Sequence, residues 1–335
     1  ALHDSVEEEL HKLVNQGVLE PTQASEWATP IVVSLKSNGK IRICGDYKAT
    51  LNKAIQNDLH PIPPISQLLT KLNQGKYFAK LDLAQAYQQL HVDDKSALAQ
   101  TIITHKGAFK AKRLQFGISS APAIFQRFIE GLLSGLDNVI PYFDDILVKA
   151  ETTNELITTL RQVFTRFRNA GITLQSEKCS LISTSVDFLG FVVSSDGIRP
   201  NPDKVKSIQE APEPSNKEQL QAFLGLLNFY HCFLPNKANV AEPLHRLLDK
   251  NVKWQWNESH KLAFSNSKNL LSSNAVLAHY NPSCHLILTC DASPYGIGCV
   301  LSQIQGGNEV PIVFYSRTMS QSERRYAQVD REALS

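Results

Sequence analysis

The chain has 335 residues, of which 42% are hydrophobic, and a formal net charge of +2. This length predicts two or three domains with sizeable cores, and the near-neutral charge favours no particular class of partner. The sequence predicts neither a membrane span nor a secretory leader, because no apolar run is long enough and the first residues form an acidic, amphipathic pattern.

The start of the chain predicts a helix and then a β-hairpin. Apolar residues recur at helical spacing over 5–19. Two runs rich in β-branched residues then flank Asn38-Gly39, which is a strong signal for a tight hairpin turn. Strand alternation in the second run directs Lys40 and Arg42 to one face and apolar side chains to the other. We therefore expect a hairpin with one cationic face.

The middle of the chain alternates helices and strands. After a proline-rich connector, the pattern predicts a helix over 65–74. Residues 75–83 ("GKYFAKLDL") are typical of a strand, and alternation places Asp82 on the same face as Lys80. The apolar run "PYFDDILV" is followed by a helix over 152–170, which a glycine ends.

The last third begins with "VDFLGFVVSSDGIRP", which predicts two short strands. The linker "EAPEPSNKE" leads into a helix whose start carries a capping box between Ser215 and Glu218. From about residue 284 the pattern changes to strands. A helix is then expected from Glu323, with a second capping box to Ser320.

The six cysteines show no CxxC pair and no tight framework, which favours reduced intracellular thiols. The chain does not begin with methionine, and its single Met is Met319. We therefore expect a piece of a longer translation product.

The stretch 95–129 holds six basic residues and no Asp or Glu. It could face phosphates, or it could be a solvated basic surface. Charge alone does not decide between these two interpretations.

Two adjacent carboxylates, Asp144 and Asp145, lie between apolar runs, with only Lys149 nearby to offset them. The pair is either a solvated hairpin tip or part of a site where a divalent cation supplies positive charge. Asp82, at the end of its strand, is either a turn residue or a third ligand. If the strands are neighbours, the three carboxylates repel one another unless two Mg²⁺ ions about 4 Å apart neutralise them.

A series of motifs then follows in order: "WATPIVVSLKSNGKIRICGDYKATLN", "LDLAQAYQQL", "LQFGISSAPAIFQRFIEGLL", "PYFDDILV", "EKCSLISTSVDFLGFVVSSDGI" and "LQAFLGLLNFYHCFLPN". This series resembles the reverse transcriptases of the gypsy class of LTR retrotransposons, over nearly the whole chain. The resemblance implies an α+β fold: a right-handed polymerase of fingers, palm and thumb, followed by an incomplete ribonuclease H-like α/β domain. Fingers and palm would occupy 1–205, thumb and connection 206–280, and the start of the ribonuclease H-like domain 281–335.

The resemblance also implies the polymerase site. Asp82, Asp144 and Asp145 would be the catalytic carboxylates that hold two Mg²⁺ ions, for which Mn²⁺ can substitute. Tyr87 would be the steric gate against a 2′-hydroxyl, although without the resemblance it reads as a core aromatic. The remaining assignments are Lys36 and Arg42 on the triphosphate, Gln115, Phe116 and Gly117 in the dNTP pocket, Phe188, Leu189 and Gly190 as primer grip, and Lys178 near the pyrophosphate.

The stretches "LTCDASPYGIGCVLSQ" and "RRYAQVDREALS" resemble the opening of a ribonuclease H domain. The resemblance implies that Asp291 and Glu332 are its first two metal carboxylates, although without it Glu332 reads as a solvated helix residue. That family site needs four acidic residues, and the other two are expected beyond Ser335. We therefore expect an incomplete domain without nuclease activity, with the loop over 303–309 open to proteolysis.

The sequence departs from the family at two positions. Gln115 stands where the family usually has Pro, and Gly45 stands where it has a β-branched residue. Gly45 is expected to weaken the fingers strand by about 0.5–1 kcal/mol. Both departures leave open an inefficient or decaying copy.

The function implied is an RNA-directed DNA polymerase that also copies DNA, in one polyprotein with a protease and an integrase. Its partners would be an RNA template, a DNA primer, the RNA–DNA hybrid and dNTPs, with no membrane, and a homodimer stays open. We expect it in cytoplasmic virus-like particles, with a nuclear location also open. The rival hypotheses are a copy that binds template-primer without chemistry and a protein that is mainly a nuclease.

Overall fold

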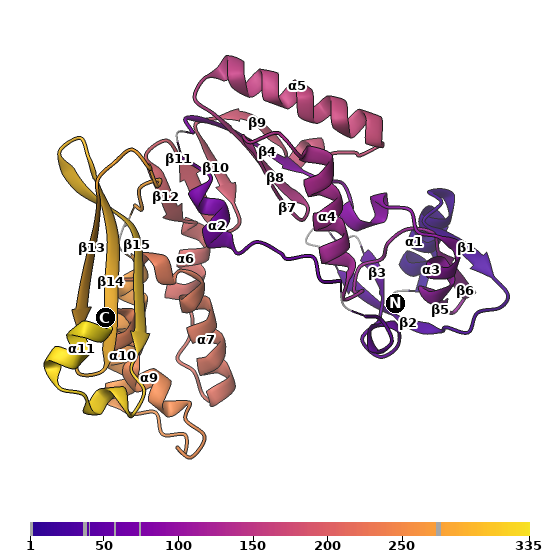
Figure 1. The fold of residues 1–335 in the computed structure, drawn as a ribbon. Coiled ribbons are helices and arrows are strands. Elements are labelled where there is room, and N and C mark those ends of the chain that lie inside the picture. The colour runs from indigo at the N-terminus through magenta and orange to yellow at the C-terminus, as the bar shows by residue number, and fades with distance from the viewer. Residues whose placement is uncertain (1–2, 36–38, 40, 57, 74, 273–275) are drawn as a thin grey trace. The chain divides into compact units, whose positions relative to one another are not determined.

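The computed structural model describes residues 3–35, 39, 41–56, 58–73, 75–272 and 276–335 (Figure 1). The chain forms two compact units. The first unit contains Ala1–Pro64, Ala79–Lys149 and Thr153–Ile182, and the second contains Ile65–Phe78, Ala150–Thr152 and Ser183–Ser335.

The first unit contains a five-stranded sheet of order β1-β6-β5-β2-β3. Its strands are β1 (Leu19–Thr22), β2 (Thr29–Leu35), β3 (Ile41–Gly45), β5 (Ile102–Thr104) and β6 (Gly107–Ala111). Strands β2 and β3 pair in antiparallel fashion, which confirms the predicted hairpin. In β3, Ile41 and Ile43 are buried and Arg42 is exposed, as alternation predicts, whereas Lys40 lies outside the described residues. The helices α1 (His3–Asn15) and α3 (Asp94–Ala99) flank this sheet.

A second sheet, of order β7-β8-β4-β9, has most of its residues in the first unit. Its strands are β4 (Tyr77–Asp82), β7 (Val139–Tyr142), β8 (Asp145–Ala150) and β9 (Ser180–Ser183). Helix α4 (Ala121–Leu133) packs on β7 and on α5 (Thr153–Ala170). Because β8 is an apolar run with both faces covered, Ile146, Leu147 and Val148 are fully buried. The sheet therefore gives a rigid frame to the residues at its strand ends.

Helix α2 (Ile65–Thr70) is shorter than the predicted 65–74. The N–H groups of Lys71 and Leu72 bond to carbonyls three residues back instead of four. This tight turn ends the helix before the strand β4 begins.

The second unit begins with a sheet of three strands, β10 (Ser185–Phe188), β11 (Phe191–Ser194) and β12 (Gly197–Pro200). The prediction of two strands over this segment is wrong. The chain reverses twice, first at Leu189-Gly190, where both φ angles are positive (50° and 83°), and again before Gly197, whose φ is 137°. Two successive residues with positive φ make the narrow turn that suits a hairpin.

Helices follow this small sheet: α6 (Pro202–Gln209), α7 (Lys217–Phe229), α8 (Lys237–Val240), α9 (Glu242–Leu247) and α10 (Glu258–Ser272). Helix α10 packs against α6, α8 and α9. The predicted cap of α7 lies one residue off. Asn216 accepts the N–H of Gln219 (2.9 Å), and the Gln219 side chain accepts the N–H of Ser215 (2.8 Å), so Glu218 is not the reciprocal partner.

The C-terminal part is an antiparallel meander of β13 (Leu286–Ala292), β14 (Gly296–Gln305) and β15 (Asn308–Thr318), followed by α11 (Gln328–Leu334) (Figure 1). The predicted 303–309 loop is wrong, because only Gly306-Gly307 lie outside the paired strands. The capping bonds between Ser320 and Glu323 are present, but they open a single 3₁₀ turn, and α11 begins at Gln328.

Within the described ranges, the structure contains no helix whose length and apolar character would let it cross a bilayer. All six cysteines lie in those ranges and all are free thiols, as the spacing predicted.

Candidate active site

Three carboxylates meet at one end of the sheet that contains β4 and β8. Asp82 is the last residue of β4, Asp145 is the first of β8, and Asp144 lies in the turn before it. The two strands are neighbours in the sheet. The N–H of Leu83 donates to the carbonyl of Asp144 (3.1 Å), which holds the end of β4 against this turn. The carboxylates predicted to act together are thus close in space.

The surroundings of Asp82 disfavour its charged form. Its side chain is 15% exposed, and burial raises the pKa of this carboxyl group. The charge of Lys178 opposes the increase, whereas the charges of Asp145 and Asp144 add to it. A carboxyl group whose pKa is raised by burial, and further by neighbouring carboxylates, is typical of a functional site.

Two lysines neutralise part of this negative charge. The ammonium of Lys80 lies 3.1 Å from Asp145 Oδ1, and that of Lys178 lies 3.7 Å from Asp82 Oδ1. The expectation that only Lys149 is near the acidic pair is therefore wrong, and Lys149 itself is buried in β8. Among the described residues, no three His, Cys, Asp or Glu side chains form a ready-made metal cluster.

A buried amide supports the turn between β7 and β8. Phe143 has a φ of 52°, which is uncommon for a residue other than glycine, and its N–H donates to Gln126 Oε1 (2.7 Å). Gln126 is fully buried, and its amide nitrogen donates to Glu130 (2.7 Å) and to the Pro141 carbonyl (3.1 Å). His60 in turn contacts Glu130 at 2.8 Å. This network fixes the turn that carries Asp144, and sequence analysis did not single it out.

Aromatic rings line the side of the site next to Asp144. The ring of Tyr87 packs against Phe116 and Phe125, with centroid distances of 5.1 and 5.6 Å. Burial, followed by the charge of Asp144, raises the pKa of Tyr87, so the ring lies within electrostatic reach of this carboxylate. The guanidinium of Arg42 lies 5.0 Å from the Phe116 ring centre. Lys36, the other predicted triphosphate contact, lies outside the described residues.

Buried hydrogen bonds and close backbone packing hold the loop that carries Gln115 and Gly117. The side chain of Gln115 is buried, accepts from Gln88 (3.2 Å) and donates to the Arg113 carbonyl (2.9 Å). Gly117 has a φ of 92°, and a Cβ there would lie 3.1 Å from the Gly45 carbonyl oxygen. Only glycine suits this position, so the loop holds the neighbouring Phe116 in place.

The predicted primer-grip residues lie in the second unit. Phe188 is buried, and Leu189 and Gly190 form the turn between β10 and β11. The hydroxyl of Tyr230 donates to the Gly190 carbonyl (3.0 Å). The turn is therefore attached to the end of α7.

Asp291 on β13 and Glu332 on α11 belong to elements that contact each other. The side-chain amide of Gln328 links α11 to β13, because it donates both to Glu332 and to the carbonyl of Ala292. Over the residues that the structure describes, no third acidic side chain joins these two in a metal cluster.

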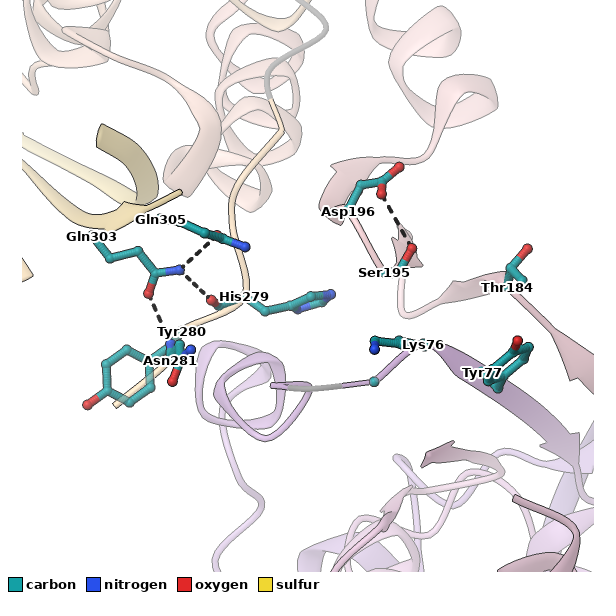
Figure 2. A pocket seen from close by; sticks show the side chains of 11 residues that line it. Lys76, Tyr77, Thr184, Ser195, Asp196, His279, Tyr280, Asn281, Gln303 and Gln305 are labelled. Carbon is teal, nitrogen blue, oxygen red and sulfur yellow. Dashed lines mark hydrogen bonds between the residues drawn. The ribbon is translucent and has the colours of Figure 1, made fainter. Parts of the chain in front are cut away.

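Figure 2 shows a polar cavity of about 500 Å³ in the second unit. Its side chains include Lys76, Asp196 and His279. The buried amide of Gln303 bridges the N–H of Asn281 (3.0 Å) and the His279 carbonyl (2.9 Å). None of the predicted site residues lines this cavity.

Four of the six basic residues of the 95–129 stretch contact acidic side chains. The pairs are Lys106 with Glu7 (2.7 Å), Lys110 with Glu20 (2.7 Å), Lys112 with Asp94 (2.5 Å) and Arg127 with Asp58 (2.9 Å). These pairs favour a solvated surface over a phosphate-binding face.

Comparison with known proteins finds two family models that match parts of this chain. Residues 34–193 match the family model for reverse transcriptase (RNA-dependent DNA polymerase), and residues 256–335 match that for the RNase H-like domain found in reverse transcriptase. The chain therefore contains a reverse transcriptase domain, followed by an RNase H-like domain of the kind found in reverse transcriptases. Among sequenced relatives, it is similar to Pol polyproteins of retrotransposons, which confirms the predicted resemblance.

Two such relatives match 98% of this chain. It is 34% identical to the retrovirus-related Pol polyprotein from transposon 297 of Drosophila melanogaster and 31% identical to the transposon Tf2-3 polyprotein of Schizosaccharomyces pombe. The chain spans 31% and 25% of their lengths. It is thus similar to one part of each longer protein.

Solved structures confirm the predicted fold class. A foamy viral protease-reverse transcriptase in complex with ds DNA matches 99% of this chain with a TM-score of 0.91 and 25% identity. The same kind of protein in complex with an RNA/DNA hybrid matches 99% with a TM-score of 0.85. This chain covers 58% and 45% of those two chains. The fold is that of a reverse transcriptase polymerase followed by a ribonuclease H-like domain.

Proposed function

We propose that this chain is a template-directed DNA polymerase that extends a primer with dNTPs and copies both RNA and DNA. The observation that carries this proposal is the convergence of Asp82, Asp144 and Asp145 at one end of a rigid sheet. The reverse transcriptase domain over residues 34–193 supports the same activity.

The donor chemistry of the site fits divalent cations. Asp82, Asp144 and Asp145 offer carboxylate oxygens, which are the ligands that Mg²⁺ prefers. Burial, and after it the charges of Asp145 and Asp144, raise the pKa of Asp82. We propose that these three residues hold two Mg²⁺ ions, with Mn²⁺ as a substitute. When bound, the ions lower the pKa of the primer 3′-hydroxyl and stabilise the charge of the leaving pyrophosphate.

The other residues of the site would bind and orient the nucleotide. The exposed Arg42 guanidinium attracts the triphosphate, and the Phe116 ring restricts where that cation can move. The Tyr87 ring is held by Phe116 and Phe125 beside Asp144, where it would exclude a ribose 2′-hydroxyl. The Gln126 network keeps the acidic turn in one conformation, so little reorganisation is needed when substrate binds.

Nucleic-acid partners are proposed from the solved relatives, which are in complex with ds DNA and with an RNA/DNA hybrid. We propose that this chain holds an RNA template paired to a DNA primer and that the turn at Leu189-Gly190 contacts the primer. In the longer polyprotein, protease and integrase parts would accompany it. The site of action would be a cytoplasmic virus-like particle.

Primer extension on a poly(A) template with an oligo(dT) primer tests this function. Asp145→Asn and Asp144→Asn should each lower incorporation by more than about 100-fold, because each removes charge from the metal site and leaves the core intact. Asp137→Asn is the matched control, since Asp137 is an exposed acid in the turn before β7. Near-wild-type extension by either active-site variant would show that this residue does not hold a catalytic metal.

The same protein sample distinguishes the polymerase from the rival function, a protein that binds template-primer without catalysing a reaction. Fluorescence anisotropy measures binding of labelled template-primer while extension is measured in parallel. A wild-type chain that binds the duplex but adds no nucleotide in Mg²⁺ or Mn²⁺ would favour the binder. Extension that depends on Asp145 would favour the polymerase.

A further inference from the structure

Lys80 occupies a position inside the acidic site. It lies on β4 two residues before Asp82, so strand alternation places both side chains on one face. Its ammonium lies 3.1 Å from Asp145 Oδ1, and both side chains are about one quarter exposed (24% and 25%). Lys178, in contrast, is 58% exposed and lies 3.7 Å from Asp82. Lys80 is therefore the closer and more enclosed of the two cations.

A cation at this distance competes with a metal ion for the same carboxylate. A divalent ion that binds an oxygen of Asp145 approaches the Lys80 ammonium as well, and the two positive charges repel each other. Partial burial weakens the screening of this repulsion by solvent and salt. Binding of the metal therefore requires that Lys80 first leave Asp145.

We propose that Lys80 is a positioning residue that holds Asp145 in the metal-free site and is displaced when a divalent ion binds there. This inference rests on the proposed function, because it takes Asp145 as a metal ligand. Lys80 lowers the affinity of the empty site for a metal alone. The site then fills when the phosphates of a nucleotide add further negative charge.

A simple structural ion pair would behave differently. It would stabilise the fold, and its removal would change the melting temperature without changing the affinity for a metal. The discriminating measurement is therefore metal binding to the protein without nucleic acid and without nucleotide.

The experiment titrates Mn²⁺ into the 335-residue chain and follows the free aqueous ion by electron paramagnetic resonance. Lys80→Met should bind Mn²⁺ about threefold to tenfold more tightly than wild type. Lys80→Arg keeps the charge and should bind like wild type. Lys76→Met is the matched control, because Lys76 is an exposed lysine just before β4 that contacts none of the three carboxylates, and it should leave the affinity unchanged.

Asp145→Asn separates failure of this inference from failure of the proposed function. If Asp145→Asn weakens Mn²⁺ binding but Lys80→Met leaves the affinity at the wild-type value, Lys80 is only a structural partner and the inference is overturned. If Asp145→Asn has no effect on Mn²⁺ binding in either the wild-type or the Lys80→Met background, Asp145 is not a metal ligand. The proposed metal site and this inference are then both wrong. A melting curve for each variant shows that it is folded, and Lys80→Gln replaces Lys80→Met if the latter is not.

Discussion

At the scale of single residues, Asp82 combines the strongest environmental effects in the acidic site. Burial and two neighbouring carboxylates raise the pKa of its side chain. The folded chain therefore keeps the Asp82 proton to a higher pH than the unfolded chain does. Above the folded pKa the carboxylate is ionised in both states, so its charge destabilises the metal-free fold, and this penalty diminishes as the pH falls below the folded pKa.

We predict that Asp82→Asn stabilises the metal-free chain. Removal of the charge should raise the melting temperature at pH 7 by about 1–3 °C, because the amide keeps the shape without the buried charge. Mg²⁺ should then raise the melting temperature of the variant less than that of wild type. Thermal melting with and without Mg²⁺ measures both effects. A lower melting temperature for the variant would mean that the Lys178 ion pair outweighs burial.

Gln126 holds the backbone of the acidic turn in place. It accepts the N–H of Phe143, whose φ is positive, and it touches none of the three carboxylates in doing so. We predict that Gln126→Leu lowers kcat by about 10–100-fold, since the turn loses its buried acceptor and Asp144 shifts. The KM for dNTP should change much less. Steady-state extension kinetics separates the two constants, and a raised KM with an unchanged kcat would assign Gln126 to nucleotide binding.

At the scale of elements, Gly45 in β3 has a packing role that the sequence did not reveal. A Cβ at this position would lie 2.6 Å from the ring of Tyr47. That ring is 1% exposed, and its hydroxyl donates to the Gln100 carbonyl (2.9 Å). The departure from a β-branched residue, which suggested a weakened copy, thus makes room for a buried ring.

We predict that Gly45→Val, which restores the residue type usual in the family, destabilises this chain. The added side chain overlaps the Tyr47 ring, and overpacking of this kind lowers the free energy of unfolding by about 1–3 kcal/mol. Gly131→Ala on α4 is the control, because its Cβ would meet nothing within 4 Å and should be neutral or stabilising. Urea unfolding of the three proteins gives the comparison. A stabilised Gly45→Val would restore the view that glycine weakens β3.

Elements with a strong periodic pattern could be predicted from the sequence, whereas their ends could not. The hairpin of β2 and β3 and the strand that ends at Asp82 follow from alternation over several residues. The segment over 186–200 was predicted as two strands and forms parts of three, and one of its reversals lies at Leu189-Gly190 inside an apolar run. The cap of α7 moved from Ser215 to Asn216 because both residues can accept a hydrogen bond there.

The same division applies to the candidate site. The three carboxylates and the ring of Tyr87 could be identified from motifs, and the structure brings them together. The lysine partners and the Gln126 network could not, because each depends on contacts between distant segments. Strand alternation placed Lys80 on the same face as Asp82, and this was the sequence signal that could have indicated a lysine in the acidic site.

At the scale of the whole molecule, the two candidate metal sites differ in completeness. The polymerase site has three carboxylates at one sheet end, whereas Asp291 and Glu332 have no third acidic partner in the described part of the chain. We predict that the 335-residue chain does not cleave the RNA strand of an RNA–DNA hybrid in Mg²⁺ or Mn²⁺, since two carboxylates do not hold two ions for in-line hydrolysis.

A labelled hybrid incubated with the purified chain measures this cleavage, with primer extension as the control for folding. Metal-dependent cleavage that disappears in Asp291→Asn would contradict the prediction. It would mean that a second copy completes the site.

The attachment of the Leu189-Gly190 turn to α7 couples the local unfolding of the β10–β11 hairpin to that of the helix. The Tyr230 hydroxyl bonds to Gly190, and the ring of Phe191 stacks on Phe229 with a centroid distance of 5.3 Å. The hairpin of β10 and β11 therefore cannot separate from the helix without breaking these contacts. Its backbone amides should exchange with deuterium at the same rate as those of the last turn of α7, so that hairpin and helix form a single cooperative unit.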